Sequence, residues 1–187
     1  MKVISGFLKG RNILGFNIEG TRPTQDRVKE SLMASIQMYI KDAVVLDLFA
    51  GSGQLGIETI SNGAKTCYFV DNNPQVIKVL KDNINKLNIK EYSRTILSDW
   101  KKILNDFANA KEKFDLIFVD PPYDYDVYEK VLKKVNELDL LSDNGIIVLE
   151  YANNKFQEQY GNLLAIKEKK YGYKNIKIFK KMKASKE

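Results

Sequence analysis

The sequence predicts an α/β fold built on an open, mostly parallel sheet with helices on both faces. From residue 43 onward, short and almost wholly apolar runs alternate with longer amphipathic segments. Strands that are apolar on both faces are typical of parallel sheets covered by helices. A glycine-rich turn joins the first apolar run to the first amphipathic segment, as in nucleotide-binding α/β units. A chain of 187 residues, 44% of them hydrophobic, can bury the core of one such domain.

Before this alternating region, the chain predicts a small N-terminal extension. Residues 2–18 carry apolar positions on either side of a central turn near Leu8–Arg11, which indicates two short strands forming a hairpin. Thr24 is expected to cap a helix that runs to about Tyr39, with Asp26 stabilising its first turn. We therefore expect a β-hairpin and helix ahead of the main sheet.

The main region predicts five strands and four helices, followed by two strands with no helix between them. Residues 163–169 and 173–181 meet at a Tyr-Gly-Tyr turn, so these two strands must pair antiparallel or lie apart. The expected domains are an extension over 1–40 and a main domain over 41–187. The five strands are expected at 44–49, 66–70, 93–97, 114–119 and 145–149, and the helices at 54–62, 74–87, 100–109 and 126–138.

The composition excludes several kinds of chemistry. Histidine is absent and Cys67 is the only cysteine, so we expect neither a disulfide framework nor a metal site. Cys67 falls in a predicted buried strand, which favours a packing role. The chain has no apolar run near 20 residues, so we expect a cytoplasmic protein without a membrane span. Carboxylates, lysines, tyrosines or backbone groups must carry any catalysis.

Positive charge is concentrated at the two ends of the chain. Residues 1–40 carry a net charge of +3, residues 41–166 carry −4, and residues 167–187 carry +7. Basic ends suit contact with a phosphate backbone, although lysine-rich segments can also serve solubility alone.

The glycine turn points to a cofactor site. Gly51, Gly53 and Gly56 fit the G-x-G-x-x-G pattern, in which backbone approaches a ligand at a helix N-terminus. Asp47, at the end of the preceding strand, would repel a pyrophosphate but would attract the ammonium group of a methionine moiety. This detail favours S-adenosylmethionine over a dinucleotide.

Two further carboxylates follow the next two strands. Asp71 stands 24 residues after Asp47, where a carboxylate can accept hydrogen bonds from ribose hydroxyls. Asp99 follows the third strand and could accept from an adenine amino group, although it could equally cap the next helix.

The most specific motif is Asp120-Pro-Pro-Tyr123 at the end of the fourth strand. An amino nitrogen attached to a base is a poor nucleophile, because its lone pair is delocalised. Asp120 and the carbonyl of Pro121 can each accept one N–H of such a group, while Tyr123 stacks on the base. These groups would orient the nitrogen toward a methyl donor, and Asp120 would stabilise the positive charge that develops on it.

Taken together, these motifs resemble the RsmD-type family of 16S ribosomal RNA guanine-N2 methyltransferases. The resemblance spans most of the chain, in order and at the family's spacing. The discriminating segment is Thr21-Arg-Pro-Thr-Gln-Asp-Arg-Val-Lys-Glu30. The other matching residues are Ile4-Ser-Gly6, Gly10-Arg11, Leu46–Gly53, Leu55-Gly56, Glu58, Val70-Asp71 and Asp120–Tyr123.

The resemblance implies a Rossmann-like class I methyltransferase with a seven-stranded sheet whose last strand is antiparallel. It also implies a guanine of 16S ribosomal RNA as target, within the small subunit or an assembly intermediate of it, and a monomeric enzyme. S-adenosylmethionine would be the methyl donor and S-adenosylhomocysteine the product, with no metal. The cofactor residues would be Asp47, Phe49, Gly51, Gly53, Asp71 and Asp99, the catalytic residues Asp120, Pro121 and Tyr123, and the substrate-binding residues Lys9, Arg11, Arg22, Thr24, Arg27 and Pro122.

Three points stay open in the sequence. Trp100 departs from the family pattern and either covers the adenine or fills core. A DNA adenine-N6 methyltransferase would use the same Asp120 motif, although 187 residues leave little room for a separate target-recognition region. A non-catalytic RNA-binding assembly factor could keep the fold, but an intact Asp120 with a complete cofactor loop argues against it.

Overall fold

The computed structural model describes residues 1–15, 23–122 and 126–183, without the side chains of residues 23–25. The described residues form one eight-stranded sheet in the order β3-β2-β1-β4-β5-β8-β7-β6. The strands are β1 (Val44–Asp47), β2 (Thr66–Asp71), β3 (Ser93–Leu97), β4 (Phe114–Val119), β5 (Leu141–Tyr151), β6 (Gln159–Tyr160), β7 (Leu163–Tyr171) and β8 (Lys174–Lys181). The α-helices are α1 (Pro23–Ile36), α2 (Gln54–Ser61), α3 (Pro74–Leu87), α4 (Trp100–Asn109) and α5 (Val127–Glu137), with 3₁₀ turns at Gln37–Tyr39 and Lys90–Tyr92.

Strands β1 to β5 pair in parallel, as the sequence predicted. The last strand, β8, lies between β5 and β7 and runs antiparallel to both. The Rossmann-like α/β fold with an antiparallel last strand is therefore confirmed. The sheet has eight strands rather than seven, because the two-residue strand β6 pairs with the outer edge of β7.

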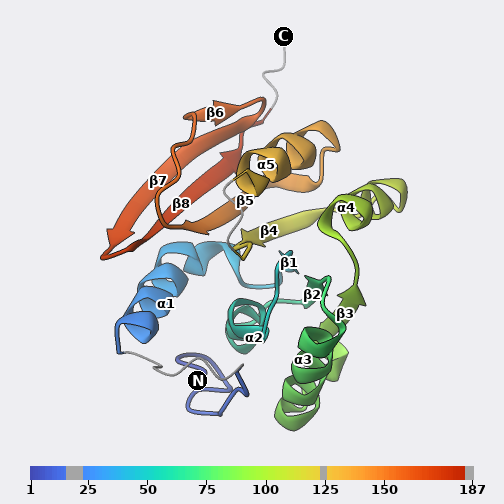
Figure 1. Ribbon diagram of the computed structural model, residues 1–187, viewed down its shortest axis with the longest axis vertical. Coiled ribbons are helices and arrows are strands. Elements are labelled where there is room, and N and C mark those ends of the chain that lie inside the picture. Colours follow the sequence, from blue (N-terminus) through green and yellow to red (C-terminus); the bar gives the residue numbers. More distant parts are fainter. Residues whose placement is uncertain (16–22, 123–125, 184–187) are drawn as a thin grey trace.

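Helices cover both faces of the sheet, and each face has its own core (Figure 1). On one face, residues of α1, α2 and α3 pack with Val45, Cys67, Phe69 and other buried strand residues. On the other face, α4 and α5 pack over a cluster that includes Phe114. Cys67 is fully buried in the first core, as expected. The alternation of strands and helices thus produces a three-layer arrangement.

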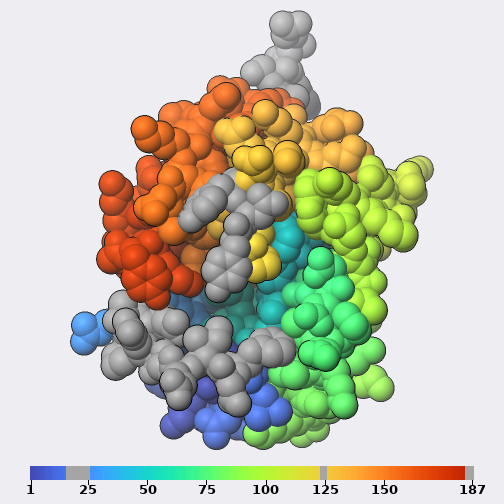
Figure 2. All heavy atoms as spheres, in the orientation of Figure 1, coloured from blue at the N-terminus to red at the C-terminus, as the bar shows by residue number. Residues whose placement is uncertain are grey.

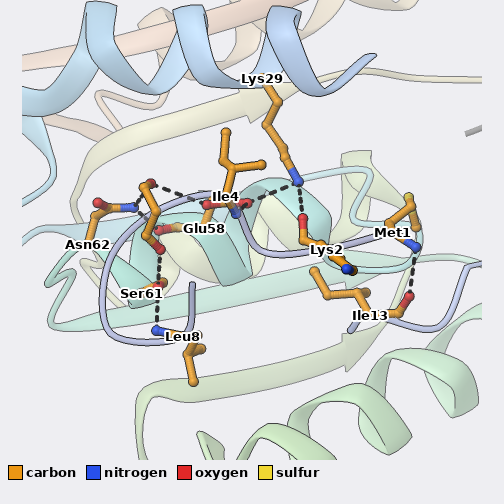
Figure 3. Close-up of polar contacts among 10 residues, drawn as sticks. Met1, Lys2, Ile4, Leu8, Ile13, Lys29, Glu58, Ser61 and Asn62 are labelled. Carbon is orange, nitrogen blue, oxygen red and sulfur yellow. Dashed lines mark hydrogen bonds and ion pairs between the residues drawn. The ribbon is translucent and has the colours of Figure 1, made fainter. Parts of the chain in front are cut away.

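The N-terminal segment is less regular than the hairpin that the sequence predicted. Its described part, residues 1–15, contains one isolated antiparallel bridge, between Lys2 and Asn12, and no strand. Two backbone N–H groups of this segment bond to side chains of α2: Ile4 N–H donates to Glu58 Oε1 at 2.7 Å, and Leu8 N–H to Ser61 Oγ at 3.0 Å (Figure 3). The two arms of this segment still pair antiparallel, because Val3 N–H donates to the carbonyl of Arg11 at 2.9 Å and Ile13 N–H to the carbonyl of Met1 at 2.8 Å. The expected hairpin pairing is therefore present, although neither arm forms a regular strand.

A buried ion pair anchors this contact. Lys29 of α1 lies 2.9 Å from Glu58 of α2, and their side chains are 4% and 0% exposed. The Lys29 ammonium also donates to the carbonyl of Lys2 at 2.8 Å (Figure 3). The discriminating family segment, which contains Lys29, therefore holds the N-terminal segment to the sheet domain.

Helix α1 begins at Pro23, one residue before the predicted cap. Proline is well suited to the first helical position, because its missing N–H would have no helical partner there. Thr24 therefore lies inside the first turn. The helix ends at Ile36, and a 3₁₀ turn continues to Tyr39.

Candidate active site

The sheet brings four aspartates to one edge. Asp47 and Asp71 end β1 and β2, while Asp99 and Asp120 follow β3 and β4. These four strands are neighbours in the sheet and run parallel, so their carboxyl ends coincide. Figure 2 shows the molecular surface hollowed where residues of the β1–α2 region are visible between α3 and the C-terminal strands. Ligands of open α/β sheets bind at this edge.

The glycine loop needs its glycines for two different reasons. Gly51 and Gly53 have φ angles of 55° and 83°, in the left-handed region that side chains disfavour. Gly56 lies inside α2, where a Cβ would come within 2.3 Å of the Phe69 ring. The first two glycines shape the turn, and Gly56 lets α2 pack closely on β2.

Asp47 is buried beneath this loop. Its Oδ2 accepts the backbone N–H of Gly56 at 3.1 Å, in the first turn of α2. Burial raises the pKa of Asp47 to about 7, the Gly56 hydrogen bond lowers it, and the carboxylate of Asp71 raises it further. Within the part of the chain that the structure describes, Asp47 forms no salt bridge with a lysine or arginine. A buried carboxylate without a basic partner is suited to a cationic ligand group.

Asp71 and Asp99 both stabilise backbone at the same edge. Asp71 accepts from Gly51 N–H at 3.2 Å and from Asn73 N–H at 2.9 Å, which ties it to the glycine loop. Asp99 caps α4, with Oδ1 accepting from Lys101 N–H at 2.8 Å. The capping role that the sequence left open for Asp99 is therefore present.

Phe49, Asn83 and Trp100 have separate packing roles. Phe49 and Trp100 are partly buried and pack against the core under α4 and α5. Asn83 of α3 is fully buried; it donates to the carbonyl of Ser52 at 3.0 Å and bonds in both directions with the backbone of Leu14. Sequence reasoning did not single out Asn83, although an asparagine in the apolar stripe of a helix is a signal for such a clamp.

Asp120 lies beside Asp47 at the end of β4. Its side chain is exposed to solvent, although many protein groups lie around it. Burial raises its pKa to about 8; Glu150 raises it as well, Lys174 opposes this, and Asp47 adds to the rise. Pro121 is buried and Pro122 is exposed. Tyr123 lies outside the described residues.

Glu150 and Lys174 are site residues that the sequence did not reveal. Glu150 lies near the end of β5, and Lys174 begins β8; the two form an ion pair next to Asp120. A charged residue directly after the apolar run 145–149 was a signal for Glu150. Lys174 could be placed only once the position of β8 in the sheet was known.

The basic residues expected to contact substrate are dispersed. Lys9, Arg11 and Arg27 are exposed, and the Arg11 guanidinium donates to the carbonyl of Lys86 at 3.1 Å. Arg22 lies outside the described residues, as does the side chain of Thr24. Near the C-terminus, Lys177 and Lys181 pair with carboxylates, so part of the positive charge of that end is neutralised internally.

Residues 1–15, 23–122 and 126–183 contain no cluster of acidic or cysteine side chains able to hold a metal ion. Within the same ranges, no helix combines the length and the apolar character that a membrane span requires.

The fold and the arrangement at its edge define a class I methyltransferase architecture. A solved structure of the Escherichia coli protein yhhF, provisionally named a methyltransferase, shares this fold with a TM-score of 0.83 and 26% identity, and the match covers 97% of each chain. The chain belongs to the family described as conserved hypothetical protein 95, whose model matches residues 1–180. The resemblance to the RsmD-type family is thereby confirmed.

Two relatives match nearly the whole chain. YlbH of Bacillus subtilis, provisionally named an rRNA methyltransferase, is 36% identical over 97% of this chain and 99% of its own length. The protein named ribosomal RNA small subunit methyltransferase D of Haemophilus influenzae is 31% identical over 96% of this chain and 93% of its own length.

Proposed function

We propose that this protein transfers a methyl group from S-adenosylmethionine to the exocyclic N2 amino group of a guanine in 16S ribosomal RNA. The observation that carries the proposal is the juxtaposition of Asp120, an acceptor suited to an amino nitrogen, with the buried carboxylate of Asp47 beneath the glycine loop. The names of the relatives support RNA of the small ribosomal subunit as the substrate class.

The residues at the edge fit the cofactor. Asp47 would hold the ammonium group of the methionine part, because it is buried and lacks a described basic partner. The left-handed backbone of Gly51 and Gly53, which carries no side chain, lets the chain pass close to a ligand. Asp71 would accept from the ribose and Asp99 from the adenine side. Phe49 would pack beside the methionine part. When bound, the cofactor supplies an electrophilic methyl group on a sulfonium.

The protein's part in the reaction is to orient the nucleophile. Asp120 would accept one N–H of the guanine amino group and the carbonyl of Pro121 the other, which directs the nitrogen lone pair toward the methyl group. As positive charge develops on nitrogen, the Asp120 carboxylate stabilises it and receives or relays the departing proton. Tyr123 and Pro122 would bound the base.

RNA would be held outside the catalytic edge. Lys9, Arg11 and Arg27 are exposed and could contact phosphates, and Arg22 and Thr24 belong to the same expected surface. In this proposal residues 1–40 serve as an RNA-contacting extension and 41–187 as the catalytic domain. The protein would act as a monomer, in the cytoplasm, on the small subunit or an assembly intermediate.

The test is methyl transfer with defined acceptors. The full chain is incubated with methyl-labelled S-adenosylmethionine and, separately, unmethylated small subunits, naked 16S RNA and duplex DNA, and the labelled base is identified by mass spectrometry. We expect N2-methylguanine in the small subunits. Label in adenine of DNA would replace the proposal with a DNA adenine-N6 methyltransferase. Binding to subunits without any transfer would support an assembly factor.

A matched control tests the role of the motif. Asp120→Ala should lower methyl transfer by about 100-fold or more, as loss of a preorganised charge-stabilising group does in other enzymes. Asp126→Ala, a nearby exposed aspartate at the start of α5, should leave the rate within about twofold. Full transfer by the Asp120 variant would remove that residue from the mechanism.

A further inference from the structure

We infer that Lys174, held in place by Glu150, is a positioning residue whose ammonium favours the carboxylate form of Asp120, the form that can accept an amino N–H. The catalytic meaning of this inference rests on the proposed function, but the effect of Lys174 on the titration of Asp120 can be measured without turnover.

Three strands bring the groups together. Val119 of β4 is in register with Leu149 of β5, which sets Asp120 beside Glu150. Glu150 in turn is in register with Ile176 of β8, two residues after Lys174. Lys174 reaches this point because the chain reverses at Gly172, whose φ of 61° suits a tight turn.

The Lys174 ammonium is held in place by an ion pair and by hydrogen bonds of the neighbouring backbone. Glu150 and Lys174 form an ion pair, with side chains 12% and 33% exposed. The Tyr128 hydroxyl donates to the Glu150 carbonyl at 2.6 Å, and the Asn175 amide donates to the carbonyl of Ala152 at 2.5 Å. These bonds fix the backbone on both sides of the pair, so the ammonium stays at one position relative to Asp120.

The charges that face Asp120 come from both strands that flank β4 and from β8, which lies beyond β5. Glu150 of β5 and Asp47 of β1 are negative, and Lys174 of β8 is positive. The loss of hydration and both carboxylates raise the pKa of Asp120, and the ammonium of Lys174 opposes the rise. Asp120 likewise raises the pKa of Lys174, although burial acts against this most strongly and Glu150 is the larger favourable partner. The interaction is therefore mutual.

If Lys174 served only to stabilise the hairpin of β7 and β8, its ion pair with Glu150 would be sufficient. In this protein the ammonium serves two carboxylates, one of them the residue expected to bind the reacting nitrogen. A protonated Asp120 would have lost the negative charge that stabilises a developing cation. By favouring the charged form of Asp120, Lys174 would therefore affect methyl transfer in a way that its ion pair with Glu150 does not explain.

The experiment compares Lys174→Met, Lys174→Arg and Glu150→Gln with the wild type in the full chain. Lys65→Met, an exposed lysine at the opposite end of β2, serves as the control. Two readouts are recorded: the ¹³C NMR titration of the Asp120 carboxyl group, and the pH profile of single-turnover methyl transfer to small subunits.

The two substitutions should act in opposite directions. Lys174→Met should move the Asp120 titration and the rate profile upward by about one pH unit, since an opposite charge at short range changes a carboxyl pKa by roughly 1–3 units. Glu150→Gln should move both downward, because it removes the larger like-charge neighbour. Lys174→Arg should restore the wild-type midpoint, and Lys65→Met should leave it unchanged.

A merely structural pair would behave differently, because both substitutions would then lower activity or Tm without moving either midpoint. That result, or an Asp120 titration unchanged within about 0.2 unit in Lys174→Met, a margin far below the roughly 1–3 units expected from a nearby opposite charge, overturns the inference. If the wild type transfers no methyl group while the titrations move as described, the proposed function fails and the electrostatic role of Lys174 stands.

Discussion

The ammonium of Lys29 lies 2.9 Å from the carboxylate of Glu58, and the same carboxylate accepts the backbone N–H of Ile4 at 2.7 Å. One buried pair therefore connects α1, α2 and the N-terminal segment. Burial of both partners makes each depend on the other, because a single remaining charge would be left in the core without compensation.

We expect Lys29→Met to destabilise the protein by about 3–5 kcal/mol, the usual result of breaking a buried ion pair from one side. Denaturant unfolding measures this, and limited proteolysis should show faster cleavage within residues 1–15. Lys102→Met removes an exposed pair with Asp106 and should cost at most about 1 kcal/mol. If both substitutions lowered the free energy of unfolding equally, burial would not explain the contribution of the Lys29–Glu58 pair.

Asp47→Asn should stabilise the free protein and weaken cofactor binding. The pKa of this acid is raised to about 7 in the folded state from an ordinary 3.8, so the folded chain holds an extra proton between these values. Stability is consequently lost as pH rises through this window, and asparagine avoids the loss. At pH 8, Tm should rise by about 2–4 °C for each kcal/mol regained.

The same variant should bind S-adenosylmethionine about 10–100-fold more weakly by calorimetry, because it removes a charged partner of the ligand ammonium. Asp42→Asn, at an exposed position before β1, is the matched control and should change neither Tm nor affinity appreciably. An Asp47→Asn protein with wild-type affinity would remove Asp47 from the cofactor site.

Methyl transfer should increase with pH toward a plateau above about 8. Asp120 works as a carboxylate, and its pKa is raised to about 8, so the active fraction grows roughly tenfold per pH unit below that value. Single-turnover rates between pH 6 and 9 measure this dependence. A flat profile in the wild type would show that ionisation of Asp120 does not limit the rate, whereas Asp120→Asn should be slow and nearly independent of pH.

Gly56→Ala should destabilise the protein even though alanine favours helices. The added Cβ would come within 2.3 Å of Phe69 and 2.7 Å of the Cys67 sulfur, which overpacks the junction of α2 and β2. A cost of about 1–3 kcal/mol is expected from overpacking, against a helix-propensity gain of up to about 1 kcal/mol. Chemical denaturation measures the balance, with Asn105→Ala on the exposed face of α4 as control.

RNA binding should depend on exposed lysines and not on the paired ones. Lys169 and Lys170 of β7 are exposed, whereas Lys177 is buried against Glu158 and Glu168. Replacing the first two with glutamine should reduce the salt dependence of 16S RNA affinity, by about one unit of slope for each phosphate that is no longer neutralised. Lys177→Gln should leave that slope unchanged. A change only in Lys177→Gln would place the RNA elsewhere.

Regular elements of this chain were predictable where local chemistry and tertiary packing agree. The helix over 74–87 was predicted to the residue, because Asn73 caps it, proline begins it and apolar residues line one face. The strand over 114–119 was also predicted to the residue, since its apolar run lies in the middle of the sheet. By contrast, β5 extends over 141–151 although residues 142–145 have the composition of a turn.

The sequence predicted the part of the candidate site that parallel strands carry, but not the part that β8 adds. Parallel strands deliver their carboxyl ends to one edge, so the sequence could place Asp47, Asp71, Asp99 and Asp120 together. Glu150 and Lys174 act on Asp120 only because β8 pairs with β5, a long-range pairing that no local pattern encodes. The N-terminal hairpin was predicted in its antiparallel pairing but not in its irregularity, since side chains of α2 bind backbone N–H groups of that segment.

The position of β8 between β5 and β7 also constrains the order in which the molecule assembles. Strand β7 precedes β8 in the chain but reaches the sheet only through it, so β7 cannot join before β8 has been made. Until then, β5 is an unpaired sheet edge with a long apolar segment, which is prone to association with other chains. A nascent chain in which β8 has not yet been made therefore lacks Lys174 beside Asp120 and leaves the edge of β5 open to association with other chains.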